Sequence, residues 1–369
     1  MKFVVSTAAH LLYSFTALAS ASPVIRHQPL FARQDIETPF NASLPTVAIF
    51  ATGGTIASQG STNTQTVGYS IGLGVQQLIS AVPEILNISN IAGYQISNVA
   101  SGSVNSTISL KLAEAINAEL AKEEISGVVI THGTDTLEET AFFLDLVVDS
   151  EKPVVCVGAM RPATALSADG PLNLLQGVTL AASEKARGRG SMIVLNDRIG
   201  SAFYTTKNNA NSLDTFYSTE QGQLGFFINQ VPYFYYTPST PIGRTHFSLA
   251  NITSLAPIDI LYAHQDMNPA LFNASYASGA QGIVYAGVGA GGMSAKADLA
   301  AEELFNATGL PIVSSHRSAE GFVSDGQDYR IAAGFLNPQK ARILLQLAVT
   351  KGLELEEIKQ VFAMGYPMV

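Results

Sequence analysis

Short runs of β-branched and aromatic residues alternate with amphipathic stretches along most of this 369-residue chain. Residues 109–124, for example, place Leu112, Ile116 and Leu120 near one face of a helix. Strands that alternate with helices form a mostly parallel sheet with helices on both faces, so we expect a doubly wound α/β fold. Further predicted strands cover residues 47–51, 127–131, 154–158 and 192–195, and further predicted helices cover 137–148 and 170–187.

One segment interrupts this alternation. Residues 230–257 are rich in proline and aromatic side chains, and we interpret them as a linker that runs over the surface. Since this length favours about two domains, we predict a larger N-terminal domain at 45–240, a linker at 241–257 and a smaller, flavodoxin-like α/β domain at 258–369. The second domain has predicted strands at 258–262, 282–286 and 311–314 and predicted helices at 269–278, 295–306, 338–351 and 354–363.

The first residues resemble a targeting segment. Lys2 precedes an apolar run, and Ala19-Ser20-Ala21 offers the small side chains that signal peptidase accepts. The run is too short to span a membrane comfortably, which disfavours an anchor. We predict a signal peptide at 1–21, a flexible N-terminus or propeptide at 22–44, and a protein secreted to the medium or the cell wall.

The net charge and the glycosylation sequons of the chain indicate which binding partners and modifications to expect. The net charge is −9, and a negative field disfavours nucleic acid and anionic membranes as partners. Only 13% of the residues are charged, and N-linked glycans would add solubility to such a chain. Six Asn-X-Ser/Thr sequons predict a glycoprotein, with candidate sites at Asn41, Asn87, Asn105, Asn251, Asn273 and Asn306.

A Gly-Gly turn follows the first predicted strand. Gly53 and Gly54 let the backbone turn sharply and bring amide N–H groups toward a ligand, and the hydroxyl of Thr55 follows at once. The turn lacks the third glycine of a dinucleotide fingerprint and the Lys-Ser/Thr end of a P-loop. Taken alone, it equally fits a tight turn with no function.

A second loop, His132 to Thr136, follows the strand at 127–131. Thr136 and Glu139 have the spacing of a capping box, which predicts a helix that begins at Leu137. Thr134 and Asp135 would then lie at a helix N-terminus, where the dipole stabilises negative charge. The alternative is that Asp135 and Thr136 only cap the helix.

Five motifs run in order from residue 46 to the C-terminus: Thr52-Gly53-Gly54-Thr55-Ile56-Ala57, Thr131 to Thr136, Gly158-Ala159-Met160-Arg161-Pro162, Ser167 to Leu174 and Leu336 to Arg342. Together they resemble the L-asparaginases, and export favours the type II branch of that family, of the eukaryotic, fungal kind. This resemblance implies hydrolysis of L-asparagine to L-aspartate and ammonia through a threonine acyl-enzyme, without a metal or organic cofactor.

The resemblance assigns two triads. Thr55 matches the nucleophile, and Tyr69 matches a tyrosine on a mobile lid, here the Gly-, Ser- and Thr-rich segment 60–74. Thr134, Asp135 and Lys207 match the second triad. Without the family match, Lys207 would be interpreted as a solvated surface lysine.

The resemblance also implies how the substrate is held. Asp135 would bind the α-ammonium group and Ser101 the α-carboxylate. Amide N–H groups near Thr55 and Thr134 would donate to the oxyanion, and Gly54 is a further candidate for substrate binding. Family members are homotetramers in which a neighbouring subunit adds a glutamate, and Glu320 is the candidate for it. Gly102 stands where relatives often carry glutamine, and the turn at 286–292 lacks a side-chain amide, so selectivity for asparagine over glutamine stays open.

Two alternatives remain at this point, a broad glutaminase-asparaginase and a silent secreted protein that binds an amino acid. Cys156, the only cysteine, lies in an apolar run and is interpreted as a buried hydrophobe. The six histidines lack metal-ligand spacing, and a structural role is favoured for His132.

Overall fold

The computed structural model describes residues 40–324 and 329–363. The predicted signal peptide at 1–21 and most of the predicted extension at 22–44 lie outside these residues. No helix in the described ranges is long and apolar enough to cross a membrane.

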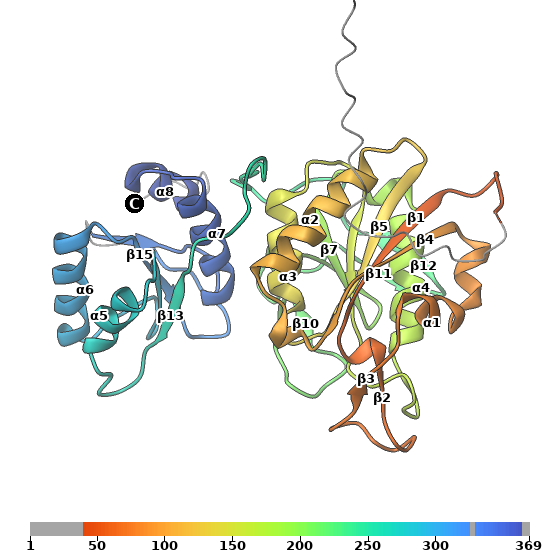
Figure 1. Cartoon of the computed structure of the whole chain (residues 1–369), viewed down its shortest axis with the longest axis horizontal. Helices are drawn as coiled ribbons and strands as arrows, with labels where there is room; N and C mark the ends of the chain where they lie inside the picture. The colour runs from red at the N-terminus through yellow and green to blue at the C-terminus, as the bar shows by residue number, and fades with distance from the viewer. Residues whose placement is uncertain (1–39, 325–328, 364–369) are drawn as a thin grey trace, which may run out of the picture. The chain divides into compact units, whose positions relative to one another are not determined.

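The larger sheet has five parallel strands and three antiparallel strands added at one edge (Figure 1). The predicted, mostly parallel N-terminal sheet is confirmed. From edge to edge its strands are β12 (Val231–Phe234), β11 (Gly225–Ile228), β8 (Arg198–Ser201), β7 (Ser191–Leu195), β6 (Val154–Val157), β5 (Ile125–Thr131), β1 (Thr46–Gly53) and β4 (Asn90–Val99).

Helices cover both faces of this sheet. They are α1 (Val75–Ser80), α2 (Ser106–Leu120), α3 (Leu137–Val147) and α4 (Gly170–Ala181). Successive residues of a strand point to opposite faces, so Ala48 and Phe50 of β1 pack with α2 and α3, while Val47 and Ile49 pack with α1 and α4. Figure 1 shows the two pairs of helices on opposite sides of the strands, which confirms the doubly wound arrangement.

The smaller sheet is entirely parallel, and its four strands follow in chain order. Phe272 and Tyr285 stack at 5.7 Å in the core under its first helices, and Leu344 and Leu347 bury the apolar face of a later helix. The predicted smaller C-terminal α/β domain is confirmed. Its elements are β13 (Asp259–Tyr262), α5 (Ala270–Ala277), β14 (Ile283–Gly287), α6 (Ala295–Thr308), β15 (Ile312–His316), β16 (Arg330–Ala332), α7 (Pro338–Thr350) and α8 (Leu355–Ala363).

The segment at 230–257 is only partly the linker that we predicted. Its first residues form β12, because Val231 to Phe234 pair with β11. Farther along, Phe247 is buried, and its N–H donates to the carbonyl of Leu146 at 2.8 Å. The many aromatic and proline residues of this segment suggested a linker, but the segment also contains strand β12 and the buried side chain of Phe247.

Short elements complete the described chain. They are η1 (Thr55–Ala57), β2 (Ser58–Gln59), β3 (Ser70–Ile71), η2 (Pro83–Asn87), η3 (Ser101–Ser103), η4 (Glu184–Ala186), β9 (Thr206–Lys207) and β10 (Phe216–Tyr217). Several of them carry the candidate site residues.

Candidate active site

Two turns meet at the carboxyl edge of the larger sheet. β1 and β5 are parallel neighbours with Ala51 opposite Thr131, so both strands end at this edge. A Cβ atom added to Gly54 would lie 2.2 Å from the Cα of Gly133, which shows that the backbones touch. Gly54 also has a φ of 83°, which side chains rarely tolerate. Glycine at both positions lets the Thr55 turn lie directly on the Thr134 turn.

Ser101 joins these turns from the other neighbour of β1. Strand β4 ends at Val99, and Ser101 opens η3 with only 4% of its surface exposed. A Cβ atom on Gly133 would lie 2.9 Å from the Oγ of Ser101, and Thr136 donates to the carbonyl of Ser101 at 2.8 Å. Three sequence-predicted site segments therefore converge at one place.

Tyr69 reaches the first turn from the predicted lid. Its OH lies 2.9 Å from the Oγ1 of Thr55. β2 and β3 pair antiparallel, so the chain leaves the Thr55 turn, folds back and returns Tyr69 beside it. The base of this hairpin is fixed to the segment 163–166, since Ala163 N–H donates to Ser58 at 2.9 Å.

Lys207 completes a cluster at the second turn. Its Nζ donates to the Oγ1 of Thr134 at 3.0 Å and lies 2.7 Å from the Oδ1 of Asp135. The side chain of Lys207 is 12% exposed, whereas that of Asp135 is 80% exposed. A solvated surface lysine is therefore the wrong interpretation, and the open side of the cluster is a carboxylate.

Glu138 is a buried residue of this region to which no sequence motif points. It lies in the first turn of α3 and accepts hydrogen bonds from Thr206 Oγ1 and from the backbone N–H of Lys207. Nothing in the sequence separates it from an ordinary acidic residue at a helix start. Strand β9, which carries Lys207, is thus tied to α3.

His132 is a neutral, structural residue next to the second turn. Its Nδ1 lies 2.8 Å from the carbonyl oxygen of Gly133, and its Nε2 lies 2.9 Å from Thr140 Oγ1. A carbonyl only accepts, so Nδ1 carries the proton and Nε2 accepts from Thr140. Burial lowers the pKa of His132 to about 4, although the bond to Gly133 opposes this shift. The favoured structural role agrees with these contacts.

The predicted capping box is wrong, although α3 does begin at Leu137. The hydroxyl of Thr136 donates to Ser101 instead of capping the helix. Glu139 forms an ion pair with Arg342 of α7 at 3.2 Å instead of folding back. Thr136 and Glu139 thus bind Ser101 and Arg342, which are distant in sequence, instead of forming the local capping box.

Glu320 lies elsewhere within its own chain. Its Oε1 accepts from the backbone N–H of Thr219 at 3.0 Å. The structure therefore brings together Thr55, Tyr69, Thr134, Asp135 and Lys207 but does not place Glu320 with them.

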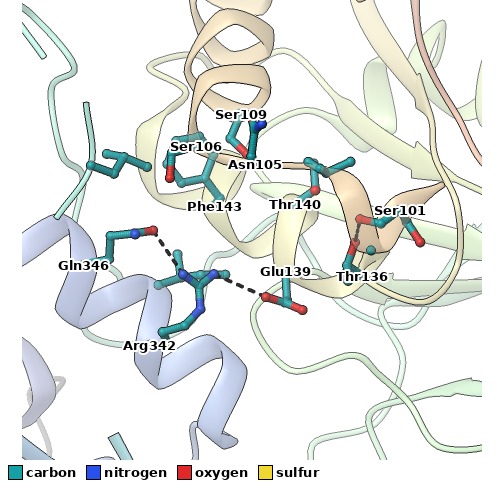
Figure 2. Close-up of a pocket in the computed structure, with 14 residues that line it drawn as sticks. Ser101, Asn105, Ser106, Ser109, Thr136, Glu139, Thr140, Phe143, Arg342 and Gln346 are labelled. Atoms are coloured by element: carbon teal, nitrogen blue, oxygen red, sulfur yellow. Dashed lines mark hydrogen bonds and ion pairs between the residues drawn. The ribbon is translucent and has the colours of Figure 1, made fainter. Parts of the chain in front are cut away.

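A cavity of about 400 Å³ opens behind Ser101 and Thr136 (Figure 2). It lies between α2, α3 and α7, and the ion pair of Glu139 with Arg342 lines it. Thr55, Thr134 and Lys207 are not among its lining residues, so the cavity adjoins the cluster without containing it.

Metal ligands and a reactive thiol are the two other kinds of functional group to consider in this region. Among the described residues, no group of three or more His, Cys, Asp and Glu side chains is placed to hold a metal ion. Cys156 is buried in β6, and desolvation raises the pKa of its thiol. The interpretation of Cys156 as an inert core residue is confirmed.

Comparison with known families and proteins gives a consistent match. The family model described as "Asparaginase, N-terminal" matches residues 46–240, and "Glutaminase/Asparaginase C-terminal domain" matches residues 257–362. L-asparaginase 2-3 of Saccharomyces cerevisiae is 50% identical over 96% of this chain and 98% of the yeast protein. L-asparaginase 2 of Bacillus subtilis is 44% identical over 95% of this chain and 96% of its own.

A solved structure is also similar. It is titled probable cytoplasmic L-asparaginase from Campylobacter jejuni, with a TM-score of 0.83, 40% identity, and coverage of 87% of this chain and 99% of the other. This finding contradicts the prediction of a secreted protein, which depended on residues 1–21, outside the described part of the chain. An apolar leader pattern alone was not sufficient for that conclusion.

Proposed function

The chain belongs to the asparaginase family and hydrolyses L-asparagine, and we propose that Thr55 is the nucleophile of this reaction. One observation carries the proposal: the turn that holds Thr55 touches the turn that holds Thr134, whose hydroxyl contacts the mostly covered amine of Lys207. A hydroxyl nucleophile, a second hydroxyl and an amine thus lie at one edge of a parallel sheet, where α/β folds bind ligands.

Thr55 would react first. Its Oγ1 attacks the side-chain amide carbon, and Tyr69, 2.9 Å away, relays the hydroxyl proton to the leaving nitrogen. The C–N bond then breaks, ammonia leaves, and the acyl group remains as an ester on Thr55. Water attacks this ester, which releases aspartate and restores the hydroxyl.

Thr134, Asp135 and Lys207 would serve proton transfer. When its Nζ is neutral, Lys207 accepts the proton of Thr134 across their 3.0 Å contact, and the hydroxyl in turn takes a proton from the attacking water. Within the described residues, the backbone N–H groups of Gly133 and Thr134 have no hydrogen-bond acceptor, so they are free to face a developing oxyanion.

The charges of the substrate match the ends of the cluster. Asp135 presents an exposed carboxylate for the α-ammonium group, and it already pairs with one cation, Lys207. Ser101 presents a hydroxyl beside Gly133 for the α-carboxylate. These assignments orient the side-chain amide toward Thr55.

We also propose that the chain forms a homotetramer, in which Glu320 of a neighbouring subunit approaches the ammonium site. The high exposure of Asp135 supports a site that is open until another subunit covers it. The domain division at 45–240, 241–257 and 258–369 stays a prediction. N-glycosylation also stays a prediction. All six sequon asparagines are exposed, which is compatible with it.

Ammonia release from purified wild-type protein and from Thr55→Ala tests the proposal. With asparagine, we expect the variant to lose at least about 10³-fold in kcat while still binding aspartate. The same assay with glutamine separates a selective enzyme from a broad amidase. Near-normal turnover by Thr55→Ala would show that another group is the nucleophile.

A further inference from the structure

Glu138 holds a buried carboxylate between three separate parts of the fold. The residue is 3% exposed, and it lies one helical position from Glu139 on α3. A buried carboxylate is costly unless hydrogen-bond donors satisfy both of its oxygens. Here one oxygen accepts from donors in β9, and the other accepts from donors at the start of α7.

On one side, Oε2 holds the strand that carries Lys207. It accepts the hydroxyl of Thr206 and, at 2.5 Å, the backbone N–H of Lys207. The carboxylate therefore fixes the backbone from which the Lys207 side chain extends to Thr134. A shift of this backbone moves Nζ away from its 3.0 Å contact.

On the other side, Oε1 faces the N-terminus of α7, in the C-terminal part of the chain. It accepts from the side-chain amides of Asn337 at 3.2 Å and Gln339 at 2.5 Å. Asn337 also caps α7, because its Oδ1 accepts from the N–H of Lys340 at 3.0 Å. The positive end of this helix dipole favours the negative charge of Glu138.

Lys340 of α7 binds the chain just before β9. Its buried Nζ donates to the carbonyls of Ala202, Phe203 and Thr205, at 2.9, 3.0 and 2.7 Å. Residues 202–207 are thus held from α7 at both ends, directly by Lys340 and through Glu138.

We propose that Glu138 is a positioning residue, through which α7 of the same chain sets the place of the Lys207 amine. The inference rests on the proposed function, because it assumes that Lys207 takes part in turnover. It adds an intrachain role for the C-terminal domain, distinct from any residue that a neighbouring subunit supplies.

Glu138→Gln is the decisive change. Each carboxylate oxygen of Glu138 accepts from two donors. A glutamine amide has only one accepting oxygen, so its NH₂ group would face one of these two pairs of donors and form no hydrogen bond with it. We expect kcat to fall about tenfold or more while KM for asparagine changes less than about twofold, since no substrate contact is altered.

Two further variants separate positioning from helix packing. Glu139→Gln breaks the ion pair with Arg342 that joins the same two helices (Figure 2) but leaves Lys207 untouched, so we expect near-normal kcat. The double change Glu138→Gln with Gln339→Glu restores a donor–acceptor pair on the α7 side, and we expect most of the lost kcat to return. If Glu138→Gln does not fold, Gln339→Ala replaces it, with an expected fall in kcat of about threefold at unchanged KM.

The outcomes are distinguishable from failure of the proposed function. Lys207→Met with normal turnover overturns the assignment of Lys207 itself. If Lys207→Met is inactive but folded Glu138→Gln keeps normal kcat, the positioning role is wrong. An equal loss in Glu139→Gln also overturns it, because helix packing alone would then explain the effect.

Discussion

The Oγ1 of Thr55 and the OH of Tyr69 lie 2.9 Å apart, although Thr55 comes just after β1 and Tyr69 lies just before β3, the returning strand of the β2–β3 hairpin. Their contact joins the Thr55 turn at the edge of the large sheet to a largely exposed segment. The position of the lid therefore decides whether the nucleophile has a partner for its proton.

Tyr69→Phe tests this contact with the loss of one oxygen atom. We expect kcat for asparagine to fall about 100-fold, because a positioned proton-transfer group typically contributes that much, while the melting temperature stays unchanged. Steady-state ammonia release gives the comparison. Tyr276→Phe, on the exposed surface of α5, is the matched control, and equal rates for the two variants would remove Tyr69 from the mechanism.

Gln65 organises the lid that carries Tyr69. Its Oε1 accepts from Ser61 N–H at 2.6 Å, and its Nε2 donates to the carbonyls of Val67 and Gly68, each at 2.9 Å. We expect Gln65→Ala to lower kcat/KM about tenfold, because the lid must then be ordered at the expense of binding. Gln76→Ala on α1 is the control. A variant as active as the wild type would show that the lid orders without this side chain.

The two turns of the site were predictable from the sequence because their signals are local. Gly53-Gly54-Thr55 and His132 to Thr136 each follow an apolar run, and parallel strands end at the same edge. The predicted start of α3 at Leu137 is also correct, although the capping box on which it was based does not form. The side chains of Thr136 and Glu139 instead contact distant residues that no local pattern encodes.

Glu138 and β4 were not predictable, for a shared physical reason. The burial of Glu138 depends on Asn337, about 200 residues away, and no local pattern encodes that contact. Strand β4 at the sheet edge includes Asn90, Gln95 and Asn98, which mask its apolar face. Contacts between distant segments, and not propensity, decided both.

Ser101→Ala tests substrate recognition. Among the described residues the Oγ of Ser101 has no hydrogen-bond partner, so its loss should leave stability nearly unchanged. A hydrogen bond to a charged carboxylate contributes about 1.5–3 kcal/mol, so we expect KM for asparagine to rise about 10- to 100-fold with kcat largely kept. Ser103→Ala, exposed in the same turn, is the control. An unchanged KM for Ser101→Ala would exclude it from carboxylate binding.

The neutral state of His132 predicts an acid-sensitive fold. Its pKa is lowered from 6.5 to about 4 in the folded chain, chiefly by burial, so between these values the unfolded chain binds more protons. Stability is therefore lost as the pH falls from about 6.5 toward 4, and this residue alone should cost about 2 kcal/mol between pH 7.5 and 5. His132→Gln cannot titrate, so its urea midpoint should fall less than that of the wild type over this range. The exposed His246→Gln should behave like the wild type, and an identical pH dependence in His132→Gln would show that His132 is not the group that titrates.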